Sequence, residues 1–166
     1  SNPVYLALVT DAYSKMIVGY DVSNSLNASG TVRALKMATS QRKYKKEDLI
    51  HYSDRGLQYC GNDYQNALGK SKIKCSMTEK YDPYENAVAE RVNGILKQEF
   101  ILGVKFNDIN LMKTLIKESI QIYNEERPHY SNYYKTPQEM HQQREMKMRT
   151  HKKRKKNSIT KNSDAT

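Results

Sequence analysis

Runs and stripes of apolar residues along the chain predict short strands that alternate with helices. Two runs rich in β-forming residues, 4–10 and 16–22, are separated by a short polar stretch, which is typical of a β-hairpin. Shorter runs at 49–53 and 73–78 predict two further strands, the first of them buried. A hairpin followed by alternating helices and strands indicates a mixed α/β sheet flanked by helices.

Apolar residues spaced three and four apart predict the helices. The predicted helices cover residues 28–42, 61–71, 86–100 and 111–126. Pro128 disfavours helical geometry at the residue before it, so the fourth helix ends by Arg127. Thr136 and Pro137 have the residue types of a helix N-cap and first turn, and they predict the start of a last short helix.

Apolar residues nearly vanish after Gln143, so we expect a core domain over 1–143 and a disordered tail over 144–166. The net charge of the chain is +10. Nine of its 28 Lys and Arg residues but only two of its 18 acidic residues lie in the tail, which therefore carries +7 of that charge. A basic tail is typical of a solvated arm that binds polyanions. The predicted DNA contacts in it are Lys152, Lys153, Arg154, Lys155 and Lys156.

Several classes of protein and site are disfavoured by composition. Cys60 and Cys75 lie 15 residues apart without a CxxC pair, so neither a disulfide framework nor a zinc site is expected. No apolar run reaches the roughly 18–20 residues that cross a bilayer, and the apolar stretch 4–9 is too short for a signal peptide. We therefore expect a cytoplasmic protein without a membrane partner. No motif for a small-molecule substrate is evident either, because nucleophilic Ser/His/Asp sets and phosphate-binding Gly loops are missing from the sequence.

Two carboxylates have positions that suit metal-dependent chemistry. Asp54 follows the predicted strand 49–53, and Glu90 lies in an otherwise apolar turn of the helix 86–100, with 35 residues between them. Strand ends in α/β sheets face the crevice where ligands bind. Two carboxylates brought together there would offer the oxygen ligands that Mg²⁺ prefers. The alternatives are a turn-capping role for Asp54 and a plain surface position for Glu90.

Cationic and polar neighbours of these carboxylates are predicted to contact DNA. Lys97 lies seven residues after Glu90, which at about 100° per residue returns it to the same helix face two turns later. Arg55 follows Asp54 directly, and Asn93 lies one turn after Glu90. A face with one carboxylate and one ammonium group suits phosphoryl transfer.

Four motifs in order resemble the catalytic core of DDE transposases and integrases. The segments HYSDRGLQY at 51–59 and NAVAERVNGILKQEF at 86–100 resemble the D,35-E half of the DDE signature of bacterial insertion-sequence transposases, with retroviral integrases as more distant relatives. YLALVTDAYSKMIVGY at 5–20 resembles the hairpin of that family, and YNEERPHYSNYYKTPQEM at 123–140 resembles its C-terminal segment. The resemblance covers about residues 5–141. It implies a ribonuclease-H-like fold that cuts and joins DNA with Mg²⁺ or Mn²⁺.

The resemblance also implies roles for individual residues and partners. Asp54 matches the second catalytic acid and metal ligand, Glu90 matches the third, and Lys97 matches the basic residue that the family uses on DNA. The implied partners are transposon ends, target DNA and further copies of the protein, at the nucleoid of a bacterial cytoplasm. Two alternatives remain: an inactive remnant that acts as a DNA-binding or inhibitory subunit, and a nuclease that cuts without joining.

The first acid of the family lies on a strand that precedes the hairpin. Only four residues stand before Tyr5 in this sequence, and none of them is Asp. We therefore expect the chain to lack the first strand and first catalytic Asp, with a strand missing from the edge of the sheet. Asp11 is expected to close the hairpin turn with Ser14 rather than to bind metal.

Two histidines and three tyrosines in the motifs have simpler expected roles. His51 and His129 have no second ligand at metal spacing, so packing or hydrogen bonding is expected of both. Tyr130, Tyr133 and Tyr134 are expected either to touch DNA or to cover the core.

Overall fold

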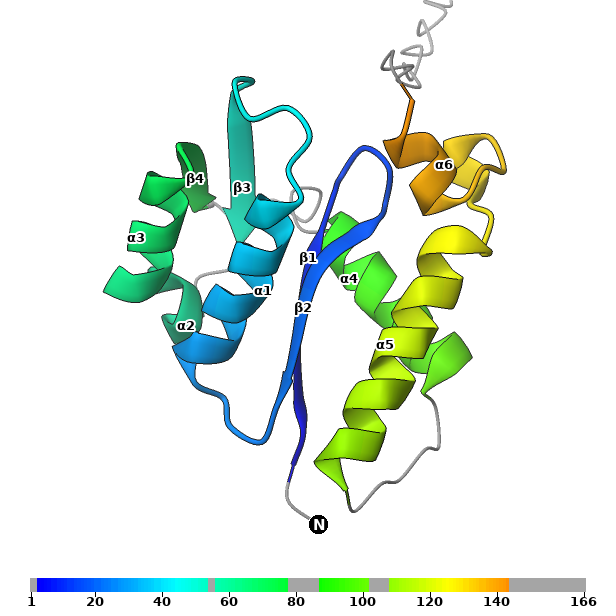
Figure 1. Cartoon of the computed structure of the whole chain (residues 1–166), viewed down its shortest axis with the longest axis horizontal. Coiled ribbons are helices and arrows are strands. Elements are labelled where there is room, and N and C mark those ends of the chain that lie inside the picture. Colours follow the sequence, from blue (N-terminus) through cyan, green and yellow to red (C-terminus); the bar gives the residue numbers. More distant parts are fainter. Residues whose placement is uncertain (1–2, 54–55, 78–86, 102–107, 144–166) are drawn as a thin grey trace, which may run out of the picture.

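The first two strands form the antiparallel hairpin that the apolar runs predict. The computed structural model describes residues 3–53, 56–77, 87–101 and 108–143. In it, β1 (Tyr5–Thr10) pairs with β2 (Ile17–Ser23), and the register shifts between Val9 and Thr10. Figure 1 shows this hairpin in the middle of the molecule, between one group of helices and strands on the left and another group of helices on the right.

Helix α1 (Ala28–Ser40) covers one face of the hairpin, and Gly19 of β2 allows it to approach closely. Ala34 and Leu35 are the buried apolar residues of this helix. A Cβ atom at position 19 would lie 2.1 Å from the backbone oxygen of Ala34 and 3.0 Å from Cβ of Ala38. The distance between helix and strand therefore depends on the absence of a side chain at Gly19.

We expect Gly19→Ala to lower the free energy of unfolding by roughly 1–3 kcal/mol, because the added methyl group forces α1 away from the hairpin. The matched control is Gly69→Ala in α3 (Asn62–Lys70), where a Cβ meets no described atom within 4 Å. There Ala should leave stability unchanged or raise it by about 0.5–1 kcal/mol. Urea unfolding of both variants measures the difference, and equal stabilities would contradict the close approach.

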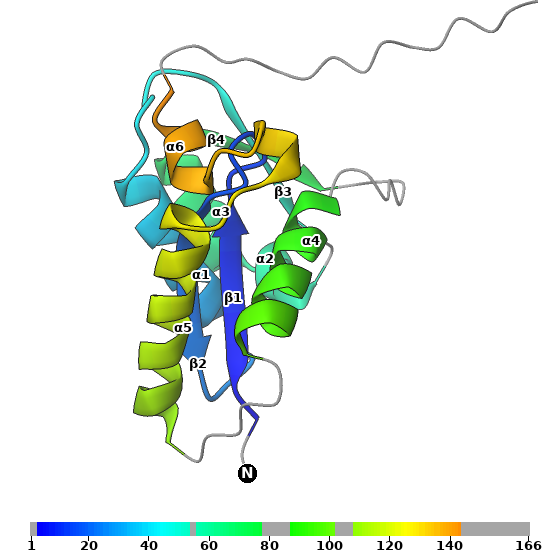
Figure 2. The ribbon, with the colours of Figure 1, turned by 90° about the vertical axis from the view of Figure 1, so that its right-hand side faces the viewer.

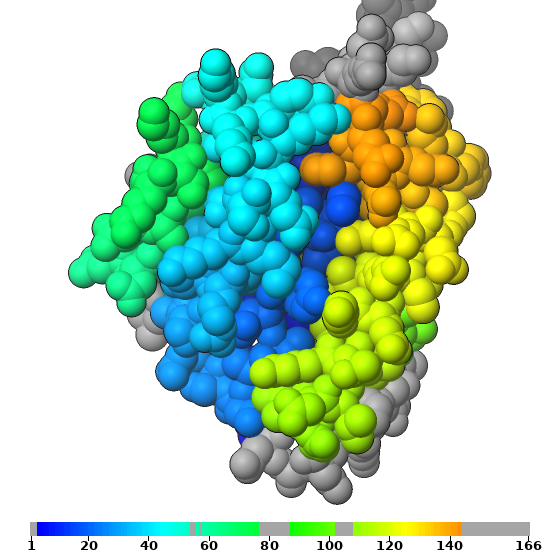
Figure 3. Space-filling view, in the orientation of Figure 1, coloured from blue at the N-terminus to red at the C-terminus, as the bar shows by residue number. Residues whose placement is uncertain are grey.

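The opposite face of the hairpin is covered by α4 (Ala87–Ile95), the π-helical turn η1 (Leu96–Phe100) and α5 (Ile109–Glu125). Figure 2 shows α5 and α4 on either side of β1; α4 packs against β1 and α5 against β2. The buried residues of this layer come from both strands and helices: Ile17, Val22, Val92, Leu96, Ile116, Ile120 and Tyr123. In Figure 3 only a thin strip of the blue hairpin remains visible between α1 and α5.

The other two strands form a separate parallel pair. β3 (Leu49–Ser53) pairs with β4 (Ile73–Met77), and the chain between them includes α2 (Leu57–Cys60) and α3. Their core is smaller and joins α1 to α3 and β4 through Leu35, Tyr64, Leu68 and Ile73. Within the described residues, neither strand of the hairpin pairs with β3 or β4.

This division corrects two predictions about the sheet. The unpaired side of β1 and the unpaired side of β3 line one cavity, so the break lies between the two strand pairs and not at the edge of a sheet. The prediction that 49–53 is a buried strand is also wrong, because Leu49, Ile50 and Tyr52 are 41%, 49% and 43% exposed. The physical reason is the same in both cases: among the described residues, β3 has a strand neighbour on only one side.

The C-terminal part of the described chain begins with η2 (Tyr130–Asn132) and ends with α6 (Pro137–His141). Thr136 caps α6 as predicted: its hydroxyl accepts from the N–H of Glu139, whose carboxylate accepts from the N–H of Thr136. This reciprocal pair is a capping box. The predicted tail at 144–166 lies outside the described residues.

The described residues include both cysteines and several helices that can be tested against the predictions about disulfides and membrane spans. Neither Cys60 nor Cys75 forms a disulfide in the described part of the chain. Among the helices that the structure describes, none is long and apolar enough to cross a bilayer.

Candidate active site at the gap between the strand pairs

A cavity of about 140 Å³ lies between the two strand pairs. Its walls come from the facing strands and from the helices on either side of them. The lining residues are Leu6, Ala7, Leu8 and Val9 of β1, His51, Tyr52 and Ser53 of β3, Thr31 and Ala34 of α1, Ala89, Glu90 and Asn93 of α4, together with Tyr59 and Tyr64. Two strands separated by about 40 residues in the sequence thus meet at the cavity that also contains Glu90.

Glu90 lies in the first turn of α4, and its side chain is exposed. Asn93 follows one helical turn later and lines the same cavity, as does Ser53 at the end of β3. Asp54 is the next residue of the chain and lies outside the described residues, as does Arg55. The structure therefore brings the residue before Asp54 to the cavity of Glu90, while a direct approach of the two carboxylates stays a prediction.

The hydroxyl of Ser53 is an unusual feature of the cavity. It is buried, and within the described part of the chain it has no hydrogen-bond partner. Buried hydroxyl groups are nearly always hydrogen-bonded, so an orphaned one indicates a missing partner. Ser53 was not among the residues predicted for the site, and its position directly before Asp54 was the available signal.

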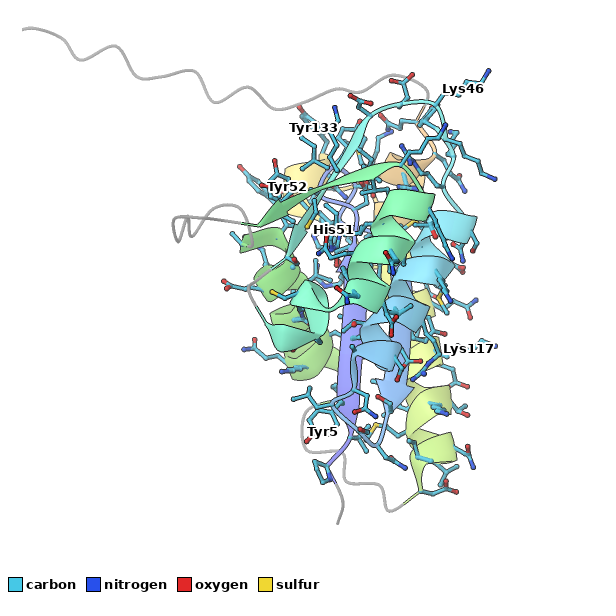
Figure 4. All side chains as sticks on the ribbon, turned by 90° about the vertical axis from the view of Figure 1, so that its left-hand side faces the viewer. Tyr5, Lys46, His51, Tyr52, Lys117 and Tyr133 are labelled. Carbon is cyan, nitrogen blue, oxygen red and sulfur yellow. The ribbon has the colours of Figure 1, made fainter. Side chains whose placement is uncertain are left out.

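His51 is held by a neighbour and is not free to act as a metal ligand through Nε2. That atom lies 2.8 Å from the hydroxyl of Tyr64, and the two rings are in contact. Burial lowers the pKa of His51, which keeps its imidazole neutral at neutral pH. Figure 4 shows His51 and Tyr52 as neighbours on β3, where successive side chains point to opposite faces. The predicted packing and hydrogen-bonding role of His51 is confirmed.

The atoms that line the cavity are of the type that binds a hard cation, but the described residues supply too few of them to hold one. Glu90, Asn93 and Ser53 all offer oxygen atoms, which Mg²⁺ prefers. Glu90 is the one carboxylate among the described lining residues, and no group of three potential metal ligands occurs in the described parts of the chain. A metal site here therefore depends on carboxylates such as Asp54 that lie outside the described residues.

Lys97 is exposed, but the helix geometry at its position differs from the prediction. The helix predicted over 86–100 is α-helical to Ile95 and continues as the π-helical turn η1. A π-turn adds a residue per turn, so the rotation of about 100° per residue does not extend from Glu90 to Lys97. The expected common face is therefore not established, and Lys97 does not line the cavity. Its contact with DNA stays a prediction.

Asp11 closes the hairpin turn, as predicted. One carboxylate oxygen accepts from the backbone N–H of Ser14 at 2.8 Å and from its hydroxyl at 2.6 Å. Nδ1 of His141 lies 3.1 Å from the Ser14 hydroxyl and 3.4 Å from Asp11, which ties the turn to α6. Burial raises the pKa of Asp11, but hydrogen bonds with His141 and Ser14 outweigh it and leave this pKa at about 2.

Asp11→Asn should lower the free energy of unfolding by about 1–2 kcal/mol near neutral pH, because the charged form accepts these hydrogen bonds best. A lowered pKa means that this stabilisation is present above the ordinary value of 3.8 and disappears as the pH falls through about 2. Urea titrations at pH 7 and pH 2 measure the loss. Asp63→Asn, at an exposed carboxylate in the first turn of α3, is the control and should change little. A difference between wild type and Asp11→Asn that persists unchanged at pH 2 would contradict the assignment.

Polar residues of the C-terminal motif also bind the hairpin. The hydroxyl of Tyr123 donates to the backbone oxygen of Lys15, and the side-chain amide of Asn124 bonds both backbone groups of Ile17 at 3.0 Å. Asn132 donates to the backbone oxygen of Ser14 at 2.6 Å. These roles were not predicted from the sequence. Asn124 is a polar residue directly after Tyr123 in the apolar stripe of α5. This position was the signal that could have indicated the hydrogen bonds of Asn124.

His129 and the tyrosines beside it differ in burial. His129 is buried with its ring edge-on to Tyr123, and burial together with nearby cations lowers its pKa to about 4, so packing is its confirmed role. Tyr130, Tyr133 and Tyr134 are exposed and therefore do not cover the core. Their contact with DNA stays a prediction.

Comparison with known proteins agrees with this geometry. The chain matches the family described as Integrase core domain over residues 1–83 and again over 71–137. It is 38% identical over 127 residues to the "Insertion element IS600 uncharacterized 31 kDa protein" of Shigella sonnei, and 35% identical over 127 residues to "Transposase InsF for insertion sequence IS3A" of Escherichia coli K12. These matches cover 76% of this chain but only 46% and 44% of the relatives, so the chain spans less than half their length.

Solved structures show the same fold at low sequence identity. The catalytic core domain of BIV integrase superposes with a TM-score of 0.63 at 16% identity, covering 83% of this chain and 85% of that one. The core domain of HTLV-2 integrase, solved in complex with magnesium, gives 0.59 at 17% identity, covering 84% and 92%. The predicted ribonuclease-H-like class is thereby confirmed. The motifs, the fold and the family matches agree: the chain belongs to the integrase core domain family and is a DDE transposase or integrase core.

Proposed function

We propose that this chain is part of the catalytic core of a DNA transposase, which cleaves a phosphodiester at the transposon end and transfers the strand to target DNA. One observation carries the proposal: Glu90 and Ser53, the residue before Asp54, line the same cavity in a chain of the integrase core domain family. This shared cavity supports the proposal that Glu90 and Asp54 are two of the catalytic acids.

Asp54 and Glu90 would hold the divalent ions, Mg²⁺ or Mn²⁺. When bound, such ions stabilise charge on the attacking and leaving oxygens of the phosphodiester. Glu90 would direct that chemistry to the cavity that β3 and α4 line. Asn93 offers an amide to the DNA beside Glu90, and Lys97 and Arg55 supply positive charge for the phosphates. A third carboxylate is required by the resemblance, and we propose that it comes from polypeptide beyond these 166 residues.

The proposed partners are duplex DNA and further copies of the same protein. Transposon ends and target DNA are the substrates, and the basic residues 144–156 would bind their phosphates without sequence preference. A chain of similar fold belongs to the simian T-cell lymphotropic virus intasome, and the HTLV-2 integrase catalytic core domain has been solved in dimeric and trimeric forms. We propose a comparable assembly on DNA in a bacterial cytoplasm.

A strand-cleavage assay on transposon-end oligonucleotides, with Mg²⁺ and with Mn²⁺, tests the proposed activity. It compares the 166-residue chain with a lengthened protein that adds the residues encoded directly upstream of Ser1. The lengthened protein should cleave and join DNA, and the 166-residue chain should not, because it supplies only two of three acids. Activity of the short chain would show that it already contains the third acid. A folded, DNA-binding but inactive lengthened protein would indicate a non-enzymatic remnant instead.

A further inference from the structure

Two neighbouring loops on the described core are rich in exposed cations. One is the loop between α1 and β3, and the other is the turn between α3 and β4, together with the last residue of α3. All of their cations named here except Arg42 are exposed. They form the basic patch, which consists of Arg42, Lys43, Lys45, Lys46, Lys70 and Lys72.

The tertiary structure joins the two loops into one surface. β3 and β4 pair in parallel with Leu49 opposite Ile73, so both strands begin at the same end of the molecule. The guanidinium group of Arg42 donates to the backbone oxygen of Ser71 at 3.1 Å and to the backbone oxygen of Glu47. In Figure 1 the cyan loop before β3 and the start of β4 both lie at the upper end.

The positive charge of the core is concentrated at this end. Residues 42–48 and 70–74 carry seven Lys and Arg against two acids, a net charge of +5, whereas the rest of residues 1–143 carries −2. One of the two acids, Asp48, forms an ion pair at 2.7 Å with Lys74, which lies outside the patch. Among the described residues, no member of the basic patch forms an ion pair with a carboxylate.

The ends of the two helices explain little of this charge. Lys70 lies in the last turn of α3, where a cation offsets the helix dipole. That effect fades beyond the last turn, so it does not account for Lys45, Lys46 or Lys72. Like charges that gather without carboxylates repel one another, and an anionic partner removes this repulsion. The basic patch therefore favours a polyanion.

We infer that the basic patch binds the phosphate backbone of duplex DNA at a place separate from the cavity of Glu90; the choice of DNA as the polyanion rests on the proposed function. β3 runs from the patch to the cavity, and its five residues span roughly 13 Å. This distance corresponds to about four base pairs along a duplex. The patch therefore holds DNA away from the bond to be cut, and it contributes affinity and orientation rather than chemistry.

The side chains of the patch suit phosphates rather than bases. Lysine ammonium groups contact phosphate oxygens without reading sequence. Tyr44 is 51% exposed, and its ring lies 5.3 Å from Nζ of Lys43, so its hydroxyl is available beside a cation. Figure 3 shows the cyan loop beside the orange helix α6, after which the chain continues into the basic residues 144–156. The patch thus adds a fixed cationic surface at the end of the core where the basic tail begins.

The affinity of the 166-residue chain for a random duplex, measured without divalent metal at several salt concentrations, tests the inference. Two double variants remove charge from one loop each: Lys45→Gln with Lys46→Gln, and Lys70→Gln with Lys72→Gln. Each should weaken binding about 10-fold at low salt and lower the slope of log affinity against log salt by about 1.8, because two phosphate contacts are lost.

The matched control removes the same charge from another surface. Lys113→Gln with Lys117→Gln changes two exposed lysines of α5, and Figure 4 shows Lys117 well away from Lys46. This variant should weaken binding by less than about 2-fold, since it loses only long-range attraction that salt screens. Equal losses in the patch variants and in the control would overturn the inference, as would unchanged binding by both patch variants.

A second measurement does not depend on the variants being folded. NMR spectra of the unaltered chain should show amide signals of residues 42–46 and 70–72 shifting as duplex is added, while those of residues 113–117 stay in place. DNA binding that leaves the signals of the patch unshifted would overturn the inference alone. A chain that binds no duplex at any salt concentration would overturn the proposed DNA partner as well, so the two failures are distinguishable.

Discussion

Glu90→Gln in the lengthened protein is expected to reduce metal-dependent DNA cleavage by on the order of 10³-fold or more, with little effect on DNA binding. The amide keeps the size of the side chain but removes the negative charge that holds a divalent ion. Glu90 is exposed in the cavity, and within the described part of the chain it forms no hydrogen bond or ion pair that the substitution would break. Strand cleavage with Mg²⁺ and with Mn²⁺, together with DNA affinity, measures the effect.

Matched substitutions separate catalysis from stability. Asp54→Asn should lower activity as strongly as Glu90→Gln, whereas Glu118→Gln on the exposed side of α5 should leave it unchanged. Asp11→Asn should keep most of the activity although it destabilises the hairpin turn. Full cleavage activity of the Glu90→Gln variant would show that Glu90 is not a catalytic residue. Loss of activity in Asp11→Asn at a temperature where that variant is folded would make Asp11 a candidate ligand instead.

Removing residues 144–166 is expected to weaken DNA binding by about 10²–10³-fold at low salt and to flatten its salt dependence. This stretch carries nine Lys and Arg residues against two acids. If roughly five of these cations contact phosphates, the slope of log affinity against log salt falls by about 4–5 units, because each contact releases condensed counterions. Affinity for a random duplex, measured at several salt concentrations, tests this prediction.

The control for the truncation keeps the length of the tail. Replacing Lys152, Lys153, Arg154, Lys155 and Lys156 by Gln should reproduce most of the loss. Replacing the same number of exposed lysines on the core, at Lys43, Lys45, Lys46, Lys113 and Lys117, should have a smaller effect. If the truncated and complete chains bind duplex DNA equally well at each salt concentration, residues 144–166 do not contribute to DNA binding.

Features formed within a few residues of each other could be predicted from the sequence. The hairpin, the cap of α6 by Thr136 and the closure of the turn by Asp11 and Ser14 are all local. Periodicity and hydrogen-bonding side chains specify such features because the interacting groups are neighbours in the chain. The same locality explains why Asp54 and Glu90 could be proposed from their positions at a strand end and a helix start.

The arrangement of elements distant in the sequence was decided only by the tertiary structure. The apolar run 49–53 predicts a buried strand, yet Leu49, Ile50 and Tyr52 are exposed, and in the described parts of the chain β3 has a strand neighbour on a single side. Likewise Asn124 and Tyr123 bond the hairpin backbone more than 100 residues away, a pairing that no local pattern indicates. Residue types determine which hydrogen bonds and apolar contacts a segment can form, whereas the neighbours that the fold supplies determine which of them are made.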